Sequence, residues 1–188
     1  MAGITDGTVS AYSQRRSALT VERVRELLDY DRHTGALTWK PRPVTWREDR
    51  RWNTSYAGRV AGSCKKDGYR FLTILACSYP YHRVAWAHHH GCWPIGVIDH
   101  ADGDLTNHRA GNLRVATISQ NTANSRKRKG TGSKLKGITF SKSHRKWTAT
   151  CIARGKSHFL GRYKSEEEAH DAYVTAASRL HGEFFRYE

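Results

Sequence analysis

The chain has 188 residues, of which 38% are hydrophobic, so it can bury one modest core or two small ones. No segment approaches the ~20 consecutive apolar residues that span a bilayer, and the first residues lack the ~7–15-residue apolar core of a signal peptide. The four cysteines are widely spaced, which argues against zinc knuckles and disulfide frameworks, and the net charge of +15 favours a polyanionic partner. We therefore expect a soluble protein whose cysteines are reduced core residues.

The N-terminal two thirds of the chain predict short elements. Residues 1–18 are polar and lack an apolar period, so we expect a flexible N-terminus. Thr20 is placed to cap a helix that runs to Tyr30, a short strand follows at residues 37–39, and residues 41–52 are expected to form a loop. Strands are predicted over residues 69–75 and 79–83, and a helix over 84–90 should end at Gly91.

The next segment has the order strand, loop, strand, helix. Val97 begins a strand that runs into Asp99 and His100, a polar loop spans residues 101–112, and a second strand covers 113–116. Thr117 has capping-box spacing to Gln120 and starts a helix that carries Asn121 and Asn124 on one face. Neighbours on a strand point to opposite faces, so Asp99 and His100 converge only if the strand bends there.

The C-terminal third predicts a separate module. Residues 129–134 form a basic linker, and strands are expected over residues 137–141, 146–153 and 157–163. Ser165 and Glu168 have capping-box spacing and begin a helix, which completes a compact α+β module. Trp147 and Phe159 are expected to pack on this helix, because the small sheet has little else to bury.

The cations are concentrated in one tract. No acidic residue lies between Leu105 and Ser165. Such a tract suits nucleic acid, because neutralised phosphates release their condensed counterions. The alternatives are a solvated basic face or an anionic membrane, but membrane binding needs an amphipathic helix where this segment predicts strands and turns. The tract contains fifteen cations: Arg109, Arg114, Arg126, Lys127, Arg128, Lys129, Lys134, Lys136, Lys142, Arg145, Lys146, Arg154, Lys156, Arg162 and Lys164.

The stretch from Asp99 to Asn124, which overlaps the start of this tract, offers what phosphodiester hydrolysis needs, which is a base, a divalent cation and a hold on phosphate. His100 is a candidate base, and Asp99 and Asn121 offer the oxygen ligands that Mg²⁺ prefers. Asn112 is placed to brace the loop and orient His100. Each of these residues alone could merely cap a turn or a helix, but their combination with the basic tract favours an active site.

Two runs carry a resemblance: YHRVAWAHHHGCWP, followed by IDHADGDLTNHRAGNLRVATISQNTANSR. They resemble the phage and intron-encoded HNH homing endonucleases, in the variant whose last histidine is asparagine. The resemblance spans residues 19–128 and implies a ββα-metal finger embedded in a small N-terminal α+β domain. It implies that His100 is the general base, that Asp99 and Asn121 bind one Mg²⁺ or Mn²⁺, and that Asn112 stabilises the finger. No structural zinc is expected.

One part of the loop departs from that family. The family usually has Asp-Asn-Arg where this chain has Asn107, His108 and Arg109. His108 is therefore a rival base.

A second resemblance covers residues 135–188. The run KGITFSKSHRKWTATCIARGKSHFLGRYKSEEEAHDAYVTAASRLHGEF resembles the DNA-binding domain of plant ethylene-response factors, which also occurs fused to phage HNH nucleases. In that family a three-stranded sheet lies in the major groove. Thr139, Ser141 and Ser157 replace arginine or tryptophan of the plant proteins, so their target sequence is not expected to carry over. The resemblance implies DNA contacts from Lys136, Thr139, Ser141, Arg145, Lys146 and Thr150.

Cations outside that sheet are also expected to contact DNA. These are Arg83, Arg109, Arg114, Arg126, Lys127, Arg128 and Lys129.

The sequence therefore predicts an α+β protein that is a metal-dependent, homing-type endonuclease. It should hydrolyse double-stranded DNA with water activated by His100 and leave a 5′-phosphate and a 3′-hydroxyl. We expect it in the cytoplasm of a bacterial host, phage-encoded or bacterial, as a monomer or transient dimer on DNA, with no membrane and no small-molecule substrate. The alternatives are a non-catalytic, sequence-specific DNA-binding regulator and a structured-RNA nuclease.

Overall fold

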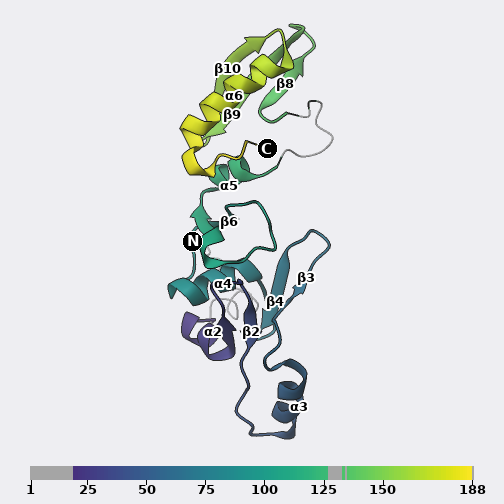
Figure 1. The fold of residues 1–188 in the computed structure, drawn as a ribbon, viewed down its shortest axis with the longest axis vertical. Helices are drawn as coiled ribbons and strands as arrows, with labels where there is room; N and C mark the ends of the chain where they lie inside the picture. The colour runs from purple at the N-terminus through teal and green to yellow at the C-terminus, as the bar shows by residue number, and fades with distance from the viewer. Residues whose placement is uncertain (1–18, 127–132, 134, 188) are drawn as a thin grey trace, which may run out of the picture. The chain divides into compact units, whose positions relative to one another are not determined.

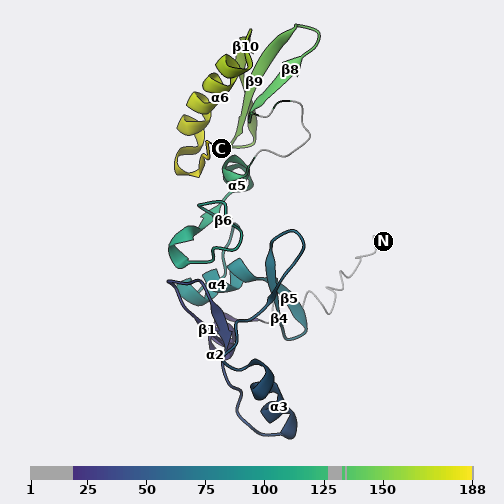
Figure 2. The same cartoon turned by 45° about the vertical axis from the view of Figure 1, so that its right-hand side comes forward.

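The computed structural model describes residues 19–126, 133 and 135–187 (Figures 1 and 2). The contacts divide these residues into two compact units. The first unit holds the described residues up to Ile95 together with Asp104–Leu113, and the second holds Gly96–Gly103 and the residues from Arg114 onward. The predicted division into domains at residues 19–128 and 135–188 stays a prediction. The predicted flexible N-terminus and all of the predicted linker except Ser133 lie outside the described residues.

The first unit begins with helix α2 (Val21–Leu27), where the Thr20 hydroxyl accepts a hydrogen bond from the Arg23 backbone N–H at 3.2 Å. The prediction that this helix reaches Tyr30 is wrong. Leu28–Tyr30 form strand β1, which pairs antiparallel with β2 (Leu37–Trp39). Leu28 and Leu37 are fully buried, so this pairing closes the core of the unit.

Helix α3 (Arg47–Tyr56) occupies part of the segment that was expected to be loop. The Asp49 carboxylate accepts hydrogen bonds from the backbone N–H groups of Thr45 at 3.0 Å and Trp46 at 2.9 Å. These bonds satisfy donors at the helix start, so a charge-rich segment that follows two prolines still forms a helix.

A three-stranded sheet and a helix complete the first unit. The sheet has the order β3 (Ser63–Cys64), β4 (Arg70–Ile74), β5 (Cys77–Pro80). Helix α4 (Tyr81–His90) begins three residues earlier than predicted and ends at Gly91, whose φ is 74°. Tyr81 is fully buried, and its hydroxyl accepts a hydrogen bond from the Leu37 backbone N–H. A short 3-10 helix, η1 (Ala110–Asn112), ends this unit's loop.

The second unit opens with the predicted strand, strand, helix order. Strand β6 (Val97–His100) pairs with β7 (Leu113–Ala116), of which Leu113 alone is counted with the first unit, and helix α5 (Ile118–Asn124) follows. Thr117 and Gln120 form the predicted capping box. These three predicted elements are confirmed.

The rest of the second unit is an antiparallel sheet with one helix. The strand order is β10 (Lys156–Tyr163), β9 (Lys146–Ala153), β8 (Ile138–Ser141). Helix α6 (Glu166–His181) covers one face of the sheet, as Figures 1 and 2 show, and η2 (Gly182–Phe184) follows it. Ala149, Cys151, Tyr173 and Ala177 form part of the core between sheet and helix. The predicted α+β class is confirmed.

All four cysteines are free thiols. Cys77 and Cys151 are buried as expected, whereas Cys64 and Cys92 are exposed, so the expectation of a core position is wrong for this pair. In the described part of the chain, no helix is both long and apolar enough to cross a membrane.

Candidate active site

The Asp99 carboxylate lies at the end of β6 and is only 3% exposed. Arg114 Nε donates to its Oδ2 at 2.8 Å, and the Asn124 amide donates to Oδ1 at 2.9 Å and to Oδ2 at 3.1 Å. A carboxylate has about four acceptor positions. Within the described residues these three bonds leave one position, on Oδ1, for a further ligand.

His100 follows Asp99 and is also 3% exposed. Its backbone carbonyl accepts a hydrogen bond from the Asn124 amide at 2.6 Å and another from the Gly103 backbone N–H at 2.8 Å. Asn124 is 4% exposed, so one buried side chain fixes both the Asp99 carboxylate and the His100 backbone. The catalytic residues predicted from the sequence do not include Asn124. Its position one helical turn after Asn121 was the only signal that could have linked it to the site.

The two other predicted asparagines lie in different units. Asn121 is half-buried on α5, three residues before Asn124, so the two amides lie on the same side of the helix. Asn112 lies in the first unit, where its Nδ2 donates to the Asn107 carbonyl at 2.8 Å. This bond braces the loop. That Asn112 orients His100 and that Asn121 binds a metal ion stay predictions.

The rival base His108 belongs to the core of the first unit. It is 4% exposed, its ring centroid lies 4.5 Å from that of Tyr81, and its carbonyl accepts a hydrogen bond from the Tyr30 hydroxyl at 2.7 Å. These contacts give His108 a packing role, whereas His100 lies beside Asp99 in the second unit.

The oxygen donors of this site fit a hard divalent cation. Asp99 keeps an acceptor position on Oδ1, and Asn121 offers an amide oxygen from α5, which packs against β6. Among the described residues, no three His, Cys, Asp or Glu side chains lie close enough together to hold a metal ion. An ion held by Asp99 and Asn121 would therefore keep most of its positions for water and phosphate, as Mg²⁺ commonly does.

Three of the cations expected to contact DNA make bonds within the protein. Arg114 pairs with Asp99, and Arg83 donates to the Pro94 carbonyl at 2.9 Å. Lys136 donates through Nζ to the carbonyls of Ala123 and Ser125 at the end of α5. Burial, assisted by the nearby charge of Arg186, lowers the pKa of Lys136 to about 8.

The other residues predicted to contact DNA differ in their exposure to solvent. Arg109 and Arg126 are exposed, as are Thr139, Arg145 and Lys146, while Ser141 and Thr150 are half-buried. Lys127, Arg128 and Lys129 lie outside the described residues.

The face of the C-terminal sheet that points away from α6 is defined by the strand register. Cross-strand partners share a face, which places Thr139, Thr148 and Arg162 in one row. We call this surface the outer face. It consists of Thr139, Ser141, Lys146, Thr148, Thr150, Phe159 and Arg162.

The prediction that Trp147 and Phe159 pack on the helix is right for Trp147 and wrong for Phe159. Trp147 packs against the core, whereas Phe159 is 60% exposed and lies 5.4 Å from the guanidinium of Arg162. The cause is a register shift between Phe159 and Gly161, whose φ is 132°. This bulge turns Arg162 to the outer face, so simple strand alternation could not have found it.

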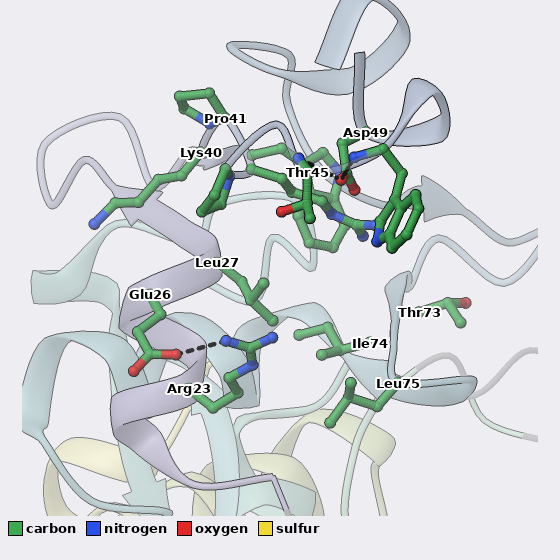
Figure 3. A pocket seen from close by; sticks show the side chains of 14 residues that line it. Arg23, Glu26, Leu27, Lys40, Pro41, Thr45, Asp49, Thr73, Ile74 and Leu75 are labelled. Atoms are coloured by element: carbon green, nitrogen blue, oxygen red, sulfur yellow. Dashed lines mark hydrogen bonds and ion pairs between the residues drawn. The ribbon is translucent and has the colours of Figure 1, made fainter. Parts of the chain in front are cut away.

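A separate pocket opens in the first unit, beside α2 and the start of α3 (Figure 3). Its acidic groups already have partners. Glu26 accepts a hydrogen bond from Arg23 at 2.7 Å, and Asp49 caps α3. None of the predicted site residues lines this pocket, so it does not form a second carboxylate site.

Two short paired strands and a helix, with an Asp-His pair and two asparagines, make the ββα arrangement that was expected of a nuclease finger. Residues 79–123 match the family described as HNH endonuclease, and that range contains Asp99, His100, Asn112 and Asn121.

Two viral relatives accompany this match. The chain is 36% identical over 107 residues to Protein 3.8 of Escherichia phage T7, which covers 56% of this chain and 88% of the phage protein. It is 34% identical over 87 residues to an uncharacterized HNH endonuclease of Acanthamoeba polyphaga mimivirus, which covers 46% of this chain and 44% of that protein. No solved structure matches the chain. The chain therefore contains an HNH endonuclease family domain at residues 79–123.

Proposed function

We propose that the chain is a divalent-metal-dependent endonuclease that hydrolyses phosphodiester bonds in double-stranded DNA. The observation that carries this proposal is the buried Asp99–His100 pair, which lies inside the segment that matches the HNH family and is held by Arg114 and by Asn124, the residue after that segment. A protein that only binds DNA has no need of a buried carboxylate beside a histidine, whereas a metal-dependent nuclease uses the carboxylate as a ligand and the histidine as a base.

In this proposal His100 removes a proton from the attacking water, since its imidazole is the base nearest to Asp99 in sequence and in the second unit. Asp99 and Asn121 would hold Mg²⁺ or Mn²⁺, which supplies Lewis-acid stabilisation of the charge that develops on phosphate and leaving oxygen. The products are a 5′-phosphate and a 3′-hydroxyl.

The outer face is the proposed DNA-holding surface. Lys146 and Arg162 supply cations for phosphates, and Phe159 supplies an exposed apolar ring for contact with bases. The surrounding threonines and serine offer hydroxyl donors and acceptors. The homing-type role rests on the family resemblance and on the viral relatives.

A supercoiled-plasmid assay tests the activity. With Mg²⁺ the wild-type chain should convert supercoiled DNA to nicked or linear forms, and His100→Ala should lower the rate at least ~100-fold, the range for loss of a general base. His33→Ala is the matched control, because His33 is exposed and lies in the first unit. Removing the metal with EDTA should stop cleavage. DNA ligase should reseal the nicks, because it requires the predicted 5′-phosphate and 3′-hydroxyl ends.

Three outcomes would reject parts of this proposal. Equal cleavage by wild type and His100→Ala rejects His100 as the base. Binding without cleavage on every DNA tried favours the DNA-binding regulator. Faster cleavage of duplex RNA than of duplex DNA favours the structured-RNA nuclease. Mapping of cut sites on both strands of a phage genome tests the homing-type specificity and separates nicking from double-strand cleavage.

A further inference from the structure

The residues that follow α6 contact the two sides of the candidate site. Arg114 reaches them from β7: its Nη1 donates to the Glu183 carbonyl at 2.8 Å, and its guanidinium lies 4.0 Å from the centroid of the Phe184 ring. The same guanidinium donates through Nε to Asp99. Arg114 therefore connects the catalytic carboxylate to a segment 69 residues further along the chain.

A second arginine, in the segment after α6, contacts the turn that follows His100. Arg186 donates through Nη1 to the carbonyl of Asp102, two residues after His100. Gly103, whose φ is 68°, lies against it, and a Cβ at this glycine would overlap the end of the Arg186 side chain. The Gly103 backbone N–H closes the same turn by donating to the His100 carbonyl. Glu183, Phe184 and Arg186 are named here the C-terminal clamp.

We propose that the C-terminal clamp is a positioning element of the nuclease site. It fixes the Arg114 guanidinium that holds Asp99 and the turn that carries His100. This inference rests on the proposed function and adds to it that residues beyond α6 are needed for cleavage.

The conformational entropy of an arginine side chain explains why Arg114 needs several contacts to hold one orientation. A free arginine side chain carries about 2 kcal/mol of rotamer entropy, so one bond to Asp99 leaves its position loose. Contacts through Nε, through Nη1 and across the guanidinium plane define a single orientation. Asp99 is buried, so a shift of Arg114 would change the charge environment of the carboxylate directly.

The test uses the whole 188-residue chain. Its variants are Phe184→Ala and Arg186→Ala. Each should lower the cleavage rate at saturating protein by about 10–100-fold, the range for residues that orient a metal ligand. The Kd for DNA should stay within about threefold of wild type. Mn²⁺ affinity, measured without DNA, should fall about tenfold, since Asp99 loses its fixed orientation.

The matched variants separate positioning from a general loss of folding. Phe184→Tyr keeps the ring under Arg114 and should keep wild-type rates. Arg186→Lys keeps a donor for the Asp102 carbonyl and should recover part of the loss. Arg179→Ala is the control, because Arg179 is an exposed arginine in the last turn of α6. It should match the wild type in rate and in Mn²⁺ affinity.

The outcomes are distinguishable from those of the proposed function. Wild-type rate and Mn²⁺ affinity in Phe184→Ala and Arg186→Ala overturn the clamp, as does a loss confined to DNA affinity. If the wild type neither cuts DNA nor binds Mn²⁺, the proposed function fails. Amide hydrogen exchange over residues 96–103 still decides on the clamp in that case. Faster exchange in Arg186→Ala than in Arg179→Ala supports it, and equal exchange rejects it.

Discussion

Asn124 is the side chain on which the geometry of the candidate site depends most directly. It bonds with both oxygens of Asp99 and with the His100 carbonyl. Asn124→Ala should lower the free energy of unfolding by about 2–3 kcal/mol, because it leaves a buried carboxylate and carbonyl with fewer donors. Cleavage should fall at least ~10-fold. Urea unfolding and plasmid nicking measure the two effects.

Asn124→Asp is the sharper form of the same test. It keeps the size of the side chain but replaces the donating amide with an acceptor beside Asp99, so it should be more harmful than Asn124→Ala. Thr122→Ala, at an exposed position of the same helix, is the control. Tolerance of aspartate at position 124 would show that the bonds of Asn124 with Asp99 and His100 are not needed.

His88 makes the stability of the first unit sensitive to pH. Burial lowers its pKa below the ordinary 6.5, although the hydrogen bond with the Leu28 carbonyl opposes this. As pH falls through the ordinary value, the unfolded chain binds a proton that the folded chain resists. The free energy of unfolding should therefore be highest above that pH and should fall below it.

Urea unfolding at about pH 7.5 and about pH 5.5 measures this effect in wild type and His88→Gln. The variant should lose less stability on acidification. A residual loss is expected, because the pKa values of His90 and His181 are also lowered by burial. An equal loss in both proteins would exclude His88 as a cause.

At the scale of elements, local patterns predicted most of the fold. Capping boxes at Thr117 and Ser165 and the alternation of the C-terminal strands gave α5, α6 and β8–β10 almost to the residue. The failures have three different causes. Leu28 leaves the helix because it pairs with Trp39, and Phe159 is exposed because of the bulge that follows it. Helix α3 was missed because its cap depends on the Asp49 side chain.

In the candidate site, too, a local motif predicted some residues and distant contacts determine the role of others. Asp99 and His100 are adjacent in sequence and precede a recognisable helix, so the motif revealed them. The role of Arg114 could not be predicted, because its partner at Glu183 is 69 residues away. A sequence shows that an arginine is present but not whether its charge faces DNA or a buried carboxylate.

Lys136 and Lys146 differ in what they contact, although both were predicted to bind DNA. Lys136 donates to the last carbonyls of α5, so Lys136→Met should lower the free energy of unfolding by about 1–3 kcal/mol and change DNA affinity little. Lys146 is exposed on the outer face, so Lys146→Met should weaken DNA binding and leave stability within about 0.5 kcal/mol. Urea unfolding and a DNA-binding titration check both variants. The reverse pattern would contradict this assignment.

At the scale of the whole molecule, the net charge of +15 predicts strongly salt-dependent DNA binding. If ~6 phosphates are contacted, raising salt from ~50 to ~200 mM should lower affinity about a thousandfold. Fluorescence anisotropy with a labelled duplex measures the slope of log Kd against log salt. The Lys146→Met protein should have a slope shallower by about one. A flat response would remove electrostatics as the source of affinity.

The bond between Arg186 and Asp102 also sets an order of events during synthesis of the chain. The two residues are 84 positions apart, which a ribosome covers in about 4–17 s. For almost all of that interval the nascent chain already carries Asp99 and His100, while Glu183 and Phe184 do not yet exist to hold Arg114. If the proposed function and the C-terminal clamp hold, the nuclease site is thus completed last, after the sheet and helix of the C-terminal module have been made.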